Sequence, residues 1–208
     1  MPVVIMKISL EQAGKKFYRH WIFRNIHATF LAPQRYALLG ANGSGKSTLM
    51  RLLAGMQAPT TGKVVHEYNG KVVTENSLFP LVSYCAPGMD IIEEMNLHEF
   101  LQFHFTHKRP LLPIAEMIPL IGLEKAAGKL IGEYSSGMKQ RVKLAQAIFA
   151  DTPLLLLDEP CTNLDDAGVA QYHRWVKDFT QNRLVIVASN DEREYEYCHE
   201  RWEVNAWK

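Results

Sequence analysis

A glycine-rich loop at residues 40–48 constrains the fold of this chain more than any other stretch. It reads Gly-Ala-Asn-Gly-Ser-Gly-Lys-Ser-Thr and matches the phosphate-binding pattern G-x-x-x-x-G-K-[ST]. Residues 35–39 before it are typical of a short apolar strand, and residues 48–54 after it are typical of a helix. Glycines let the backbone curl so that several N–H groups face one anion, and a helix N-terminus attracts the same charge. The sequence therefore predicts a strand–loop–helix unit that binds the phosphates of a nucleotide.

The polar residues of this loop have separate predicted tasks. Lys46 brings a positive charge to the outer phosphates, and the Ser47 hydroxyl can ligate Mg²⁺. We expect the nucleotide to contact Gly40, Asn42, Gly43, Ser44, Gly45, Lys46, Ser47 and Thr48. The alternative is a glycine-rich turn without function, and the strand and helix on either side argue against it.

A second motif joins a run of four leucines, residues 154–157, to the acidic pair Asp158 and Glu159. A continuous apolar run is typical of a parallel strand buried on both faces, and α/β proteins bind ligands at the carboxyl ends of such strands. We expect Asp158 to hold Mg²⁺, directly or through water, and Glu159 to polarise a water for attack on the terminal phosphate. Solvated acids can also end a strand, but the upstream phosphate loop favours the functional interpretation.

The order of elements predicts an α/β fold in which strands alternate with helices around buried apolar runs. We expect a P-loop NTPase core with a parallel sheet, an N-terminal antiparallel β part and an inserted helical subdomain. Strands are expected at residues 3–10, 21–30, 82–85, 154–157 and 184–188, with a hairpin turn at Asn69-Gly70. Residues 95–143 have a helical pattern, and Pro110, Pro113 and Pro119 are expected to break it.

These elements predict one domain over residues 1–208, with its core in residues 1–87 and 141–208 and the helical subdomain at about 88–140. The net charge of +1 lacks the basic excess of a dedicated nucleic-acid binder, so no nucleic-acid partner is expected. No apolar stretch reaches the roughly 18 residues that span a bilayer. The three cysteines form no C-x-x-C pair, and no secretion signal is visible, so we expect a reduced, cytosolic protein.

A third motif, Tyr-Ser-Ser-Gly-Met-Lys-Gln-Arg at residues 134–141, is a small-residue turn that leads into a predicted helix. Ser136 and Gly137 would place a hydroxyl and free N–H groups at the N-terminus of that helix, which makes a second anion site. An ATPase with a single site has no need of this second one.

Together, the loop at 40–48, Ser-Ser-Gly-Met-Lys-Gln at 135–140 and Leu-Leu-Leu-Leu-Asp-Glu-Pro at 154–160 resemble the nucleotide-binding subunits of ATP-binding cassette (ABC) transporters. The resemblance covers nearly the whole chain in the family's order and spacing. It implies that two subunits, identical or related, pair head to tail. Each ATP would lie between the phosphate loop of one subunit and the turn at Ser135, Ser136 and Gly137 of the other.

The resemblance also implies roles for two further segments. Residues 163–165, Asn-Leu-Asp, are similar to the family's loop that crosses the dimer interface. Phe17 or Tyr18 matches the aromatic residue that stacks on adenine, and Phe17 fits the spacing better. The alternative for Phe17 is an ordinary core aromatic.

The chain departs from the family pattern at two positions. Asn190 stands where the family usually has a His that contacts the γ-phosphate, and its amide can donate a hydrogen bond but cannot take up a proton. Residues 86–89, Ala-Pro-Gly-Met, contain no Gln, although the family usually has one there that reaches Mg²⁺ and senses the membrane partner. We expect nucleotide binding to survive, whereas hydrolysis could be slower or differently coupled.

The function implied by the resemblance is a cytosolic ATPase subunit, held at the inner face of the membrane by a separate permease subunit. Its cofactors would be ATP and Mg²⁺, and its catalytic residues Glu159, Lys46 and Asn190. One alternative is a non-transport cassette ATPase that acts on ribosomes or DNA, although these usually carry a second cassette, a coiled coil or a basic arm. Another is a regulatory module that binds nucleotide and barely hydrolyses it.

Overall fold

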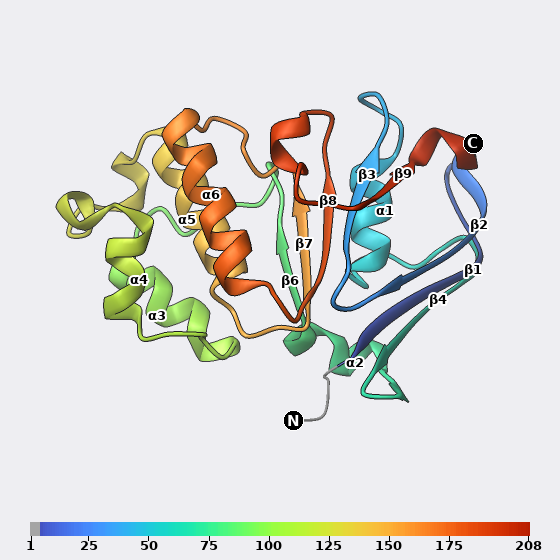
Figure 1. Cartoon of the computed structure of the whole chain (residues 1–208), viewed down its shortest axis with the longest axis horizontal. Helices are drawn as coiled ribbons and strands as arrows, with labels where there is room; N and C mark the ends of the chain where they lie inside the picture. The colour runs from blue at the N-terminus through green and yellow to red at the C-terminus, as the bar shows by residue number, and fades with distance from the viewer. Residues whose placement is uncertain (1–4) are drawn as a thin grey trace. The chain divides into compact units, whose positions relative to one another are not determined.

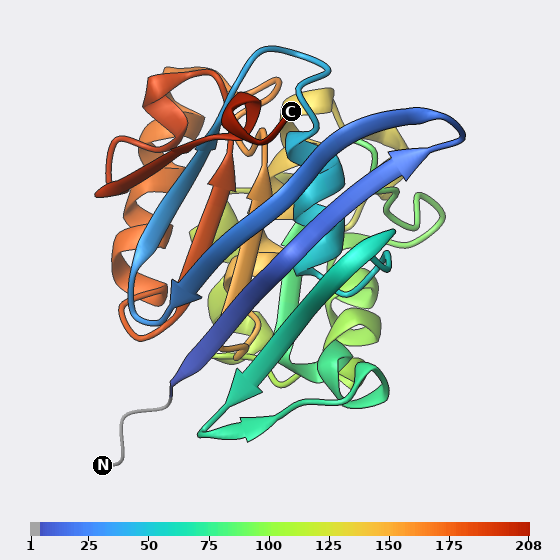
Figure 2. The same cartoon turned by 90° about the vertical axis from the view of Figure 1, so that its right-hand side faces the viewer.

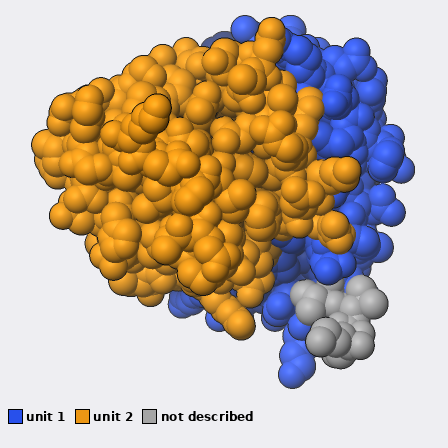
Figure 3. All heavy atoms as spheres, turned by 60° about the vertical axis from the view of Figure 1, so that its left-hand side comes forward, with its two compact units in different colours: residues 1–84, 153–159, 182–208 blue, residues 85–152, 160–181 orange. Residues whose placement is uncertain are grey.

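The computed structural model of the chain describes residues 5–208, so residues 3 and 4 of the expected first strand lie outside the described residues. The chain forms two compact units, which Figure 3 colours separately. Unit 1 comprises Met1–Tyr84, Pro153–Glu159 and Asn182–Lys208, and unit 2 comprises Cys85–Thr152 and Pro160–Gln181.

Unit 1 contains an antiparallel sheet with the strand order β2-β1-β4-β5, whose longer strands lie side by side in Figure 2. Its strands are β1 (Met6–Phe17), β2 (His20–Leu31), β4 (Thr61–Tyr68) and β5 (Lys71–Val72). Burial alternates along the start of β1 because successive side chains point to opposite faces of the sheet. The predicted hairpin turn is confirmed, since Asn69 and Gly70 adopt positive φ angles of 52° and 75° between β4 and β5.

Unit 1 also contains a sheet with the order β6-β7-β8-β3-β9, in which β7, β8, β3 and β9 pair in parallel. Its strands are β3 (Arg35–Leu39), β6 (Val82–Cys85), β7 (Leu154–Asp158), β8 (Leu184–Ala188) and β9 (Glu200–Glu203). Every residue of β7 and β8 is buried, as the continuous apolar runs predicted for a parallel strand covered on both faces. Helix α1 (Lys46–Leu53) follows β3 and packs against β7 and β8 (Figure 1).

Short helices complete unit 1. They are α2 (Glu75–Leu78), η1 (Phe79–Leu81), η4 (Glu192–Glu194) and η5 (Val204–Trp207). The last of these contacts β2, so the end of the chain packs on the antiparallel sheet.

Unit 2 is helical. Its elements are α3 (Leu97–His107), α4 (Ile114–Ile121), η2 (Glu124–Ala126), η3 (Ile131–Glu133), α5 (Ser136–Ile148) and α6 (Asp166–Phe179). Helix α3 begins at a capping box in which Asn96 and Glu99 each accept a hydrogen bond from the other's backbone N–H. After α5, the Phe149 ring lies edge-on to Trp175 and Phe179 of α6, with centroids 5.2 and 5.0 Å apart, and this aromatic contact anchors α6.

One of the three predicted proline breaks is wrong. Pro110 and Pro113 lie between helices, but Pro119 lies inside α4. Its missing N–H leaves only the carbonyl of residue 115 without a helical donor, and α4 ends soon afterwards at Gly122, whose φ is 74°. A proline this near the end disrupts little of the helix. Over residues 5–208, no helix combines the length and apolarity that crossing a membrane requires.

Candidate functional site

The loop at residues 40–48 connects β3 to α1, and its course depends on glycine at position 45. Gly45 is the N-cap of α1 and has a φ of 107°, a conformation that residues with a side chain rarely adopt. A Cβ atom there would lie 2.5 Å from Cγ2 of Ile22, which is a stiff β-branched side chain. The loop can therefore close over the helix N-terminus only because residue 45 lacks a side chain.

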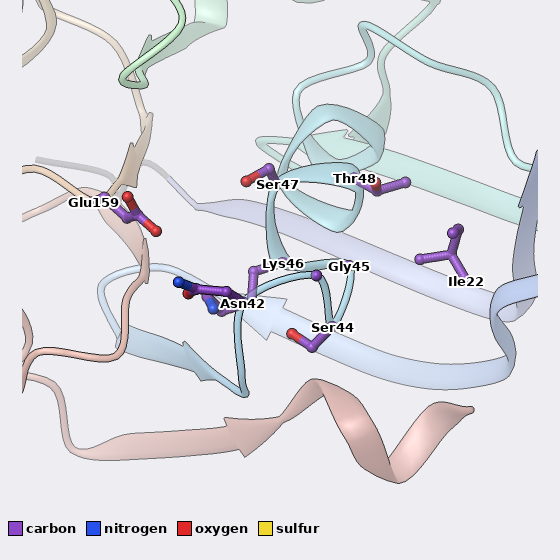
Figure 4. A pocket seen from close by; sticks show the side chains of 9 residues that line it. Ile22, Asn42, Ser44, Gly45, Lys46, Ser47, Thr48 and Glu159 are labelled. Carbon is purple, nitrogen blue, oxygen red and sulfur yellow. The ribbon is translucent and has the colours of Figure 1, made fainter.

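A cavity of about 240 Å³ lies along this loop. It is lined by Ile22, Asn42, Gly43, Ser44, Gly45, Lys46, Ser47, Thr48 and Glu159. Figure 4 shows Glu159 on one side of the loop and Ile22 on the other. The cavity thus brings most of the predicted phosphate contacts together with the predicted base.

Ile22 was not predicted as a site residue. Lys15 and Lys16 are neighbours on β1, yet they pair with Phe23 and Trp21 on β2, so Ile22 is an extra, bulged residue. This bulge places Ile22 against the loop. A bulge follows from how two strands pair, and the residues around position 22 carry no local signal for it.

Lys46 is 5% exposed and donates hydrogen bonds to protein oxygens at both sides of the loop. Its Nζ donates to the carbonyl of Gly40, to that of Ala41 at 3.5 Å and to Oδ1 of Asn190 at 3.2 Å. The Asn190 amide in turn donates to Oδ1 of Asn42 at 3.0 Å. The Asn190 side chain therefore reaches across from the end of β8 and contacts both the lysine and the loop.

Asp158 ends β7 and is 3% exposed. Burial raises the pKa of its carboxyl group, and a hydrogen bond from Ser47, together with the nearby charge of Lys46, opposes that rise. Ser47 supplies a hydroxyl oxygen and Asp158 a carboxylate oxygen, which are the ligand types that Mg²⁺ uses alongside phosphates and water. The pair fits a magnesium ion shared with a nucleotide.

Glu159 has a φ of 46°, which is uncommon for a residue with a side chain. Its backbone N–H donates to the Ala188 carbonyl at 2.9 Å, and this bond ties the turn after β7 to the end of β8. The turn places the carboxylate at the cavity (Figure 4). Unusual backbone conformations of this kind concentrate at functional sites.

Phe17 and Tyr18 do not line this cavity. Phe17 ends β1 and is 41% exposed, with the Lys15 ammonium 5.4 Å from its ring centroid. Tyr18 is 99% exposed in the turn that follows. The exposure of Phe17 does not fit a core aromatic, and its ring remains accessible to a planar ligand.

The turn at residues 135–137 belongs to unit 2 and starts α5. Ser135 is the N-cap, and its hydroxyl accepts a hydrogen bond from the Met138 N–H at 3.3 Å. Ser136 and Gly137 form the first positions of the helix, where backbone N–H groups have no helical acceptor. The helix N-terminus expected from the sequence is present.

A contact within unit 2 that the sequence did not predict joins this turn to the segment after Glu159. A Cβ atom on Gly137 would lie 2.9 Å from the Asn163 carbonyl oxygen, so the two backbones approach closely. Asp165 caps α6 by accepting from the Gly168 N–H at 2.8 Å, and its Oδ1 lies 3.5 Å from the Arg141 guanidinium. The turn at 135–137 and residues 163–165 therefore form one packed block.

Comparisons with known proteins agree with this geometry. The sequence profile of the ABC transporter family matches residues 23–162. The chain is 32% identical over 189 residues to the uncharacterised ABC transporter ATP-binding protein YxlF of Bacillus subtilis (strain 168), covering 88% of this chain and 62% of that protein. It is 31% identical over 190 residues to YybJ, another uncharacterised ABC transporter ATP-binding protein of that strain, covering 90% and 86%.

Among solved structures, the fold resembles that of the ATP-binding cassette MJ0796, a dimer in a post-hydrolysis state bound to ADP and Pi. The TM-score is 0.80 at 18% identity, with 94% of this chain and 93% of the other covered. At this identity the likeness concerns the fold.

We expect Gly45→Ala to destabilise the protein by about 1–3 kcal/mol more than Gly43→Ala, because overpacking adds to backbone strain. Both glycines have positive φ angles, but a Cβ on Gly43 meets no atom within 4 Å, whereas one on Gly45 meets Ile22. Urea unfolding of the two variants measures the difference. Equal destabilisation would show that the Ile22 side chain can move aside, and that the loop does not require a residue without a Cβ atom at position 45.

Proposed function

Because this chain belongs to the ABC transporter family as an ATP-binding subunit, we propose that it binds Mg-ATP along residues 40–48 and hydrolyses it to power a membrane transporter. The observation that carries the proposal is the convergence of Lys46, Asn190 and Glu159 on the loop, with the Asp158 carboxylate beside Ser47. These groups come from three different elements of unit 1. A positive charge, a neutral donor, a base and a metal-binding pair are the parts that phosphoryl transfer to water requires.

In the proposed reaction, the phosphates rest on the loop N–H groups and at the N-terminus of α1. Lys46 places its charge on the outer phosphates, and Asn190 donates a hydrogen bond to the γ-phosphate. Ser47 and Asp158 would hold Mg²⁺, which would neutralise negative charge on the phosphates. Glu159 accepts a proton from the attacking water. Phe17, half-exposed at the end of β1, stacks on the adenine.

The helix N-terminus at Ser135, Ser136 and Gly137 supports a dimer in which this second anion site serves the ATP of the other subunit. We propose head-to-tail pairing of two such chains, or of this chain with a related cassette. We propose further that residues 1–208 form one cassette domain with a core at 1–87 and 141–208. These bounds differ from those of the compact units, because residues 141–152 and 160–181 belong to unit 2. The helical subdomain, about residues 88–140, would bind a separate permease at the inner face of the membrane, which makes this chain a peripheral, cytoplasmic subunit.

A second candidate is a regulatory module that binds ATP and barely hydrolyses it. Two observations favour it, namely Asn190 in place of the family's His and the lack of Gln in residues 86–89. The measured turnover distinguishes this candidate from a transport ATPase.

Mg-ATP should stabilise the protein by about 2.7 kcal/mol when its concentration is 100 times the dissociation constant. Lys46→Ala should abolish the thermal shift, because the outer phosphates lose their cation. The exposed Lys71→Ala is the matched control and should shift like the wild type. A wild-type protein that shows no shift in differential scanning fluorimetry would refute nucleotide binding at this loop.

Glu159→Gln should slow hydrolysis by about 10²–10⁴-fold, the usual contribution of a general base, while nucleotide binding persists. The variant should accumulate as an ATP-bound dimer, which gel filtration with Mg-ATP can detect. Hydrolysis at the wild-type rate would mean that another group activates the water.

Asn190→His should raise the rate of ATP hydrolysis by about three- to thirty-fold, and Asn190→Ala should lower it. Loss of a transition-state donor costs about 10²–10³ in rate. The neutral amide keeps one donor, so the wild-type rate should lie between that of the Ala variant and that of the His variant. Steady-state phosphate release from the three proteins measures this order. If all three hydrolyse ATP at one rate, residue 190 does not contact the reacting phosphate.

A further inference from the structure

Tyr84 makes a contact at the proposed metal site that the mechanism above does not use. It lies on β6, is 8% exposed, and its hydroxyl donates to Oδ2 of Asp158 at 3.4 Å. Asp158 and Tyr84 are separated by 74 residues in sequence, and the contact places the phenol on the carboxylate that faces Ser47. One carboxylate therefore has a hydroxyl partner from α1 and another from β6.

The direction of the Tyr84 hydrogen bond follows from its other neighbour. The guanidinium of Arg51, on α1, lies beside the Tyr84 hydroxyl. A guanidinium has donors only, so the side of the phenol that faces Arg51 can offer only its oxygen. Its single hydrogen is then available to Asp158, whose ionised carboxylate can only accept. Arg51, Tyr84 and Asp158 therefore form a relay, in which the Tyr84 oxygen faces Arg51 and its hydrogen faces Asp158.

Such a relay fixes the orientation of a metal ligand. Groups that hydrogen-bond to a ligating carboxylate limit its rotation, and losing one of them weakens metal binding without removing any ligand. The contact joins β6 to Asp158, in a chain with no Gln in residues 86–89.

We propose that Tyr84 is a positioning residue for magnesium, and that it orients the Asp158 carboxylate for the ion with Arg51 fixing the direction of its hydroxyl. The inference rests on the proposed function, since it assumes that Asp158 and Ser47 hold the Mg²⁺ of Mg-ATP. It assigns to β6 itself a role at the metal site. Residues 86–89, which follow β6, contain no Gln that could contact the ion.

The experiment measures how much Mg²⁺ is needed for half of the ATP-induced thermal stabilisation, at fixed ATP, and compares this with ATP binding in EDTA. Tyr84→Phe removes only the hydroxyl and should raise the half-saturating Mg²⁺ concentration by about three- to ten-fold, the effect of one modest hydrogen bond. The affinity for ATP in EDTA should stay within about two-fold of wild type, because Tyr84 does not line the cavity along the phosphate loop. Arg51→Met should raise the Mg²⁺ requirement by a smaller factor of about two to three.

Tyr36→Phe is the matched control, because Tyr36 is also buried in unit 1 and its hydroxyl accepts from the Leu31 N–H, away from Asp158. It should leave the Mg²⁺ requirement unchanged. A Tyr84→Phe protein with the same requirement as Tyr36→Phe would overturn the inference, as would a loss of ATP affinity in EDTA that equals the loss in Mg²⁺. Should Tyr84→Phe not fold, Arg51→Met at its exposed position decides, and a wild-type Mg²⁺ requirement there overturns the relay. A wild-type protein that does not bind ATP refutes the proposed function itself, which is a different result.

Discussion

A carboxylate buried at the end of a strand needs polar partners, and Asp158 obtains its partners from several elements. It is 3% exposed, and burial alone would drive it toward its neutral form. The Ser47 hydroxyl from α1 and the Tyr84 hydroxyl from β6 converge on it, and the Lys46 charge lies near. The geometry of the phosphate loop and the sheet is therefore coupled, because neither can shift without leaving this carboxylate without partners.

The sequence predicted the parts of the site that consist of consecutive residues. The loop at 40–48 and the acidic pair after residues 154–157 are contiguous patterns, and each implies its own local backbone. The family's spacing likewise predicted Asn190 at the end of β8, where its amide contacts Lys46. The N-terminus of α5 at residues 135–137 is local in the same way, since a serine cap and a glycine suffice to describe it.

The parts that the sequence did not predict depend on pairing between distant segments. Ile22 lines the cavity because β1 and β2 pair with one extra residue at that point, and no property of residue 22 reveals the offset. Tyr84 looks like any aromatic residue in a buried strand until β7 brings Asp158 beside it. Pro119 was expected to end a helix, but a proline near the last turn disrupts too little to do so.

The close approach of Gly137 to the Asn163 carbonyl has a consequence for how such subunits diversify. With a Cβ at residue 137 only 2.9 Å from that oxygen, the turn at 135–137 and the segment at 163–165 share one steric boundary, which the Arg141–Asp165 contact reinforces. A substitution in the turn at 135–137 must then remain compatible with the segment at 163–165, and the reverse also holds. These two segments, 28 residues apart at Gly137 and Asp165, therefore constrain one another through their packing. A chimera built from two such cassettes should keep both segments from the same parent.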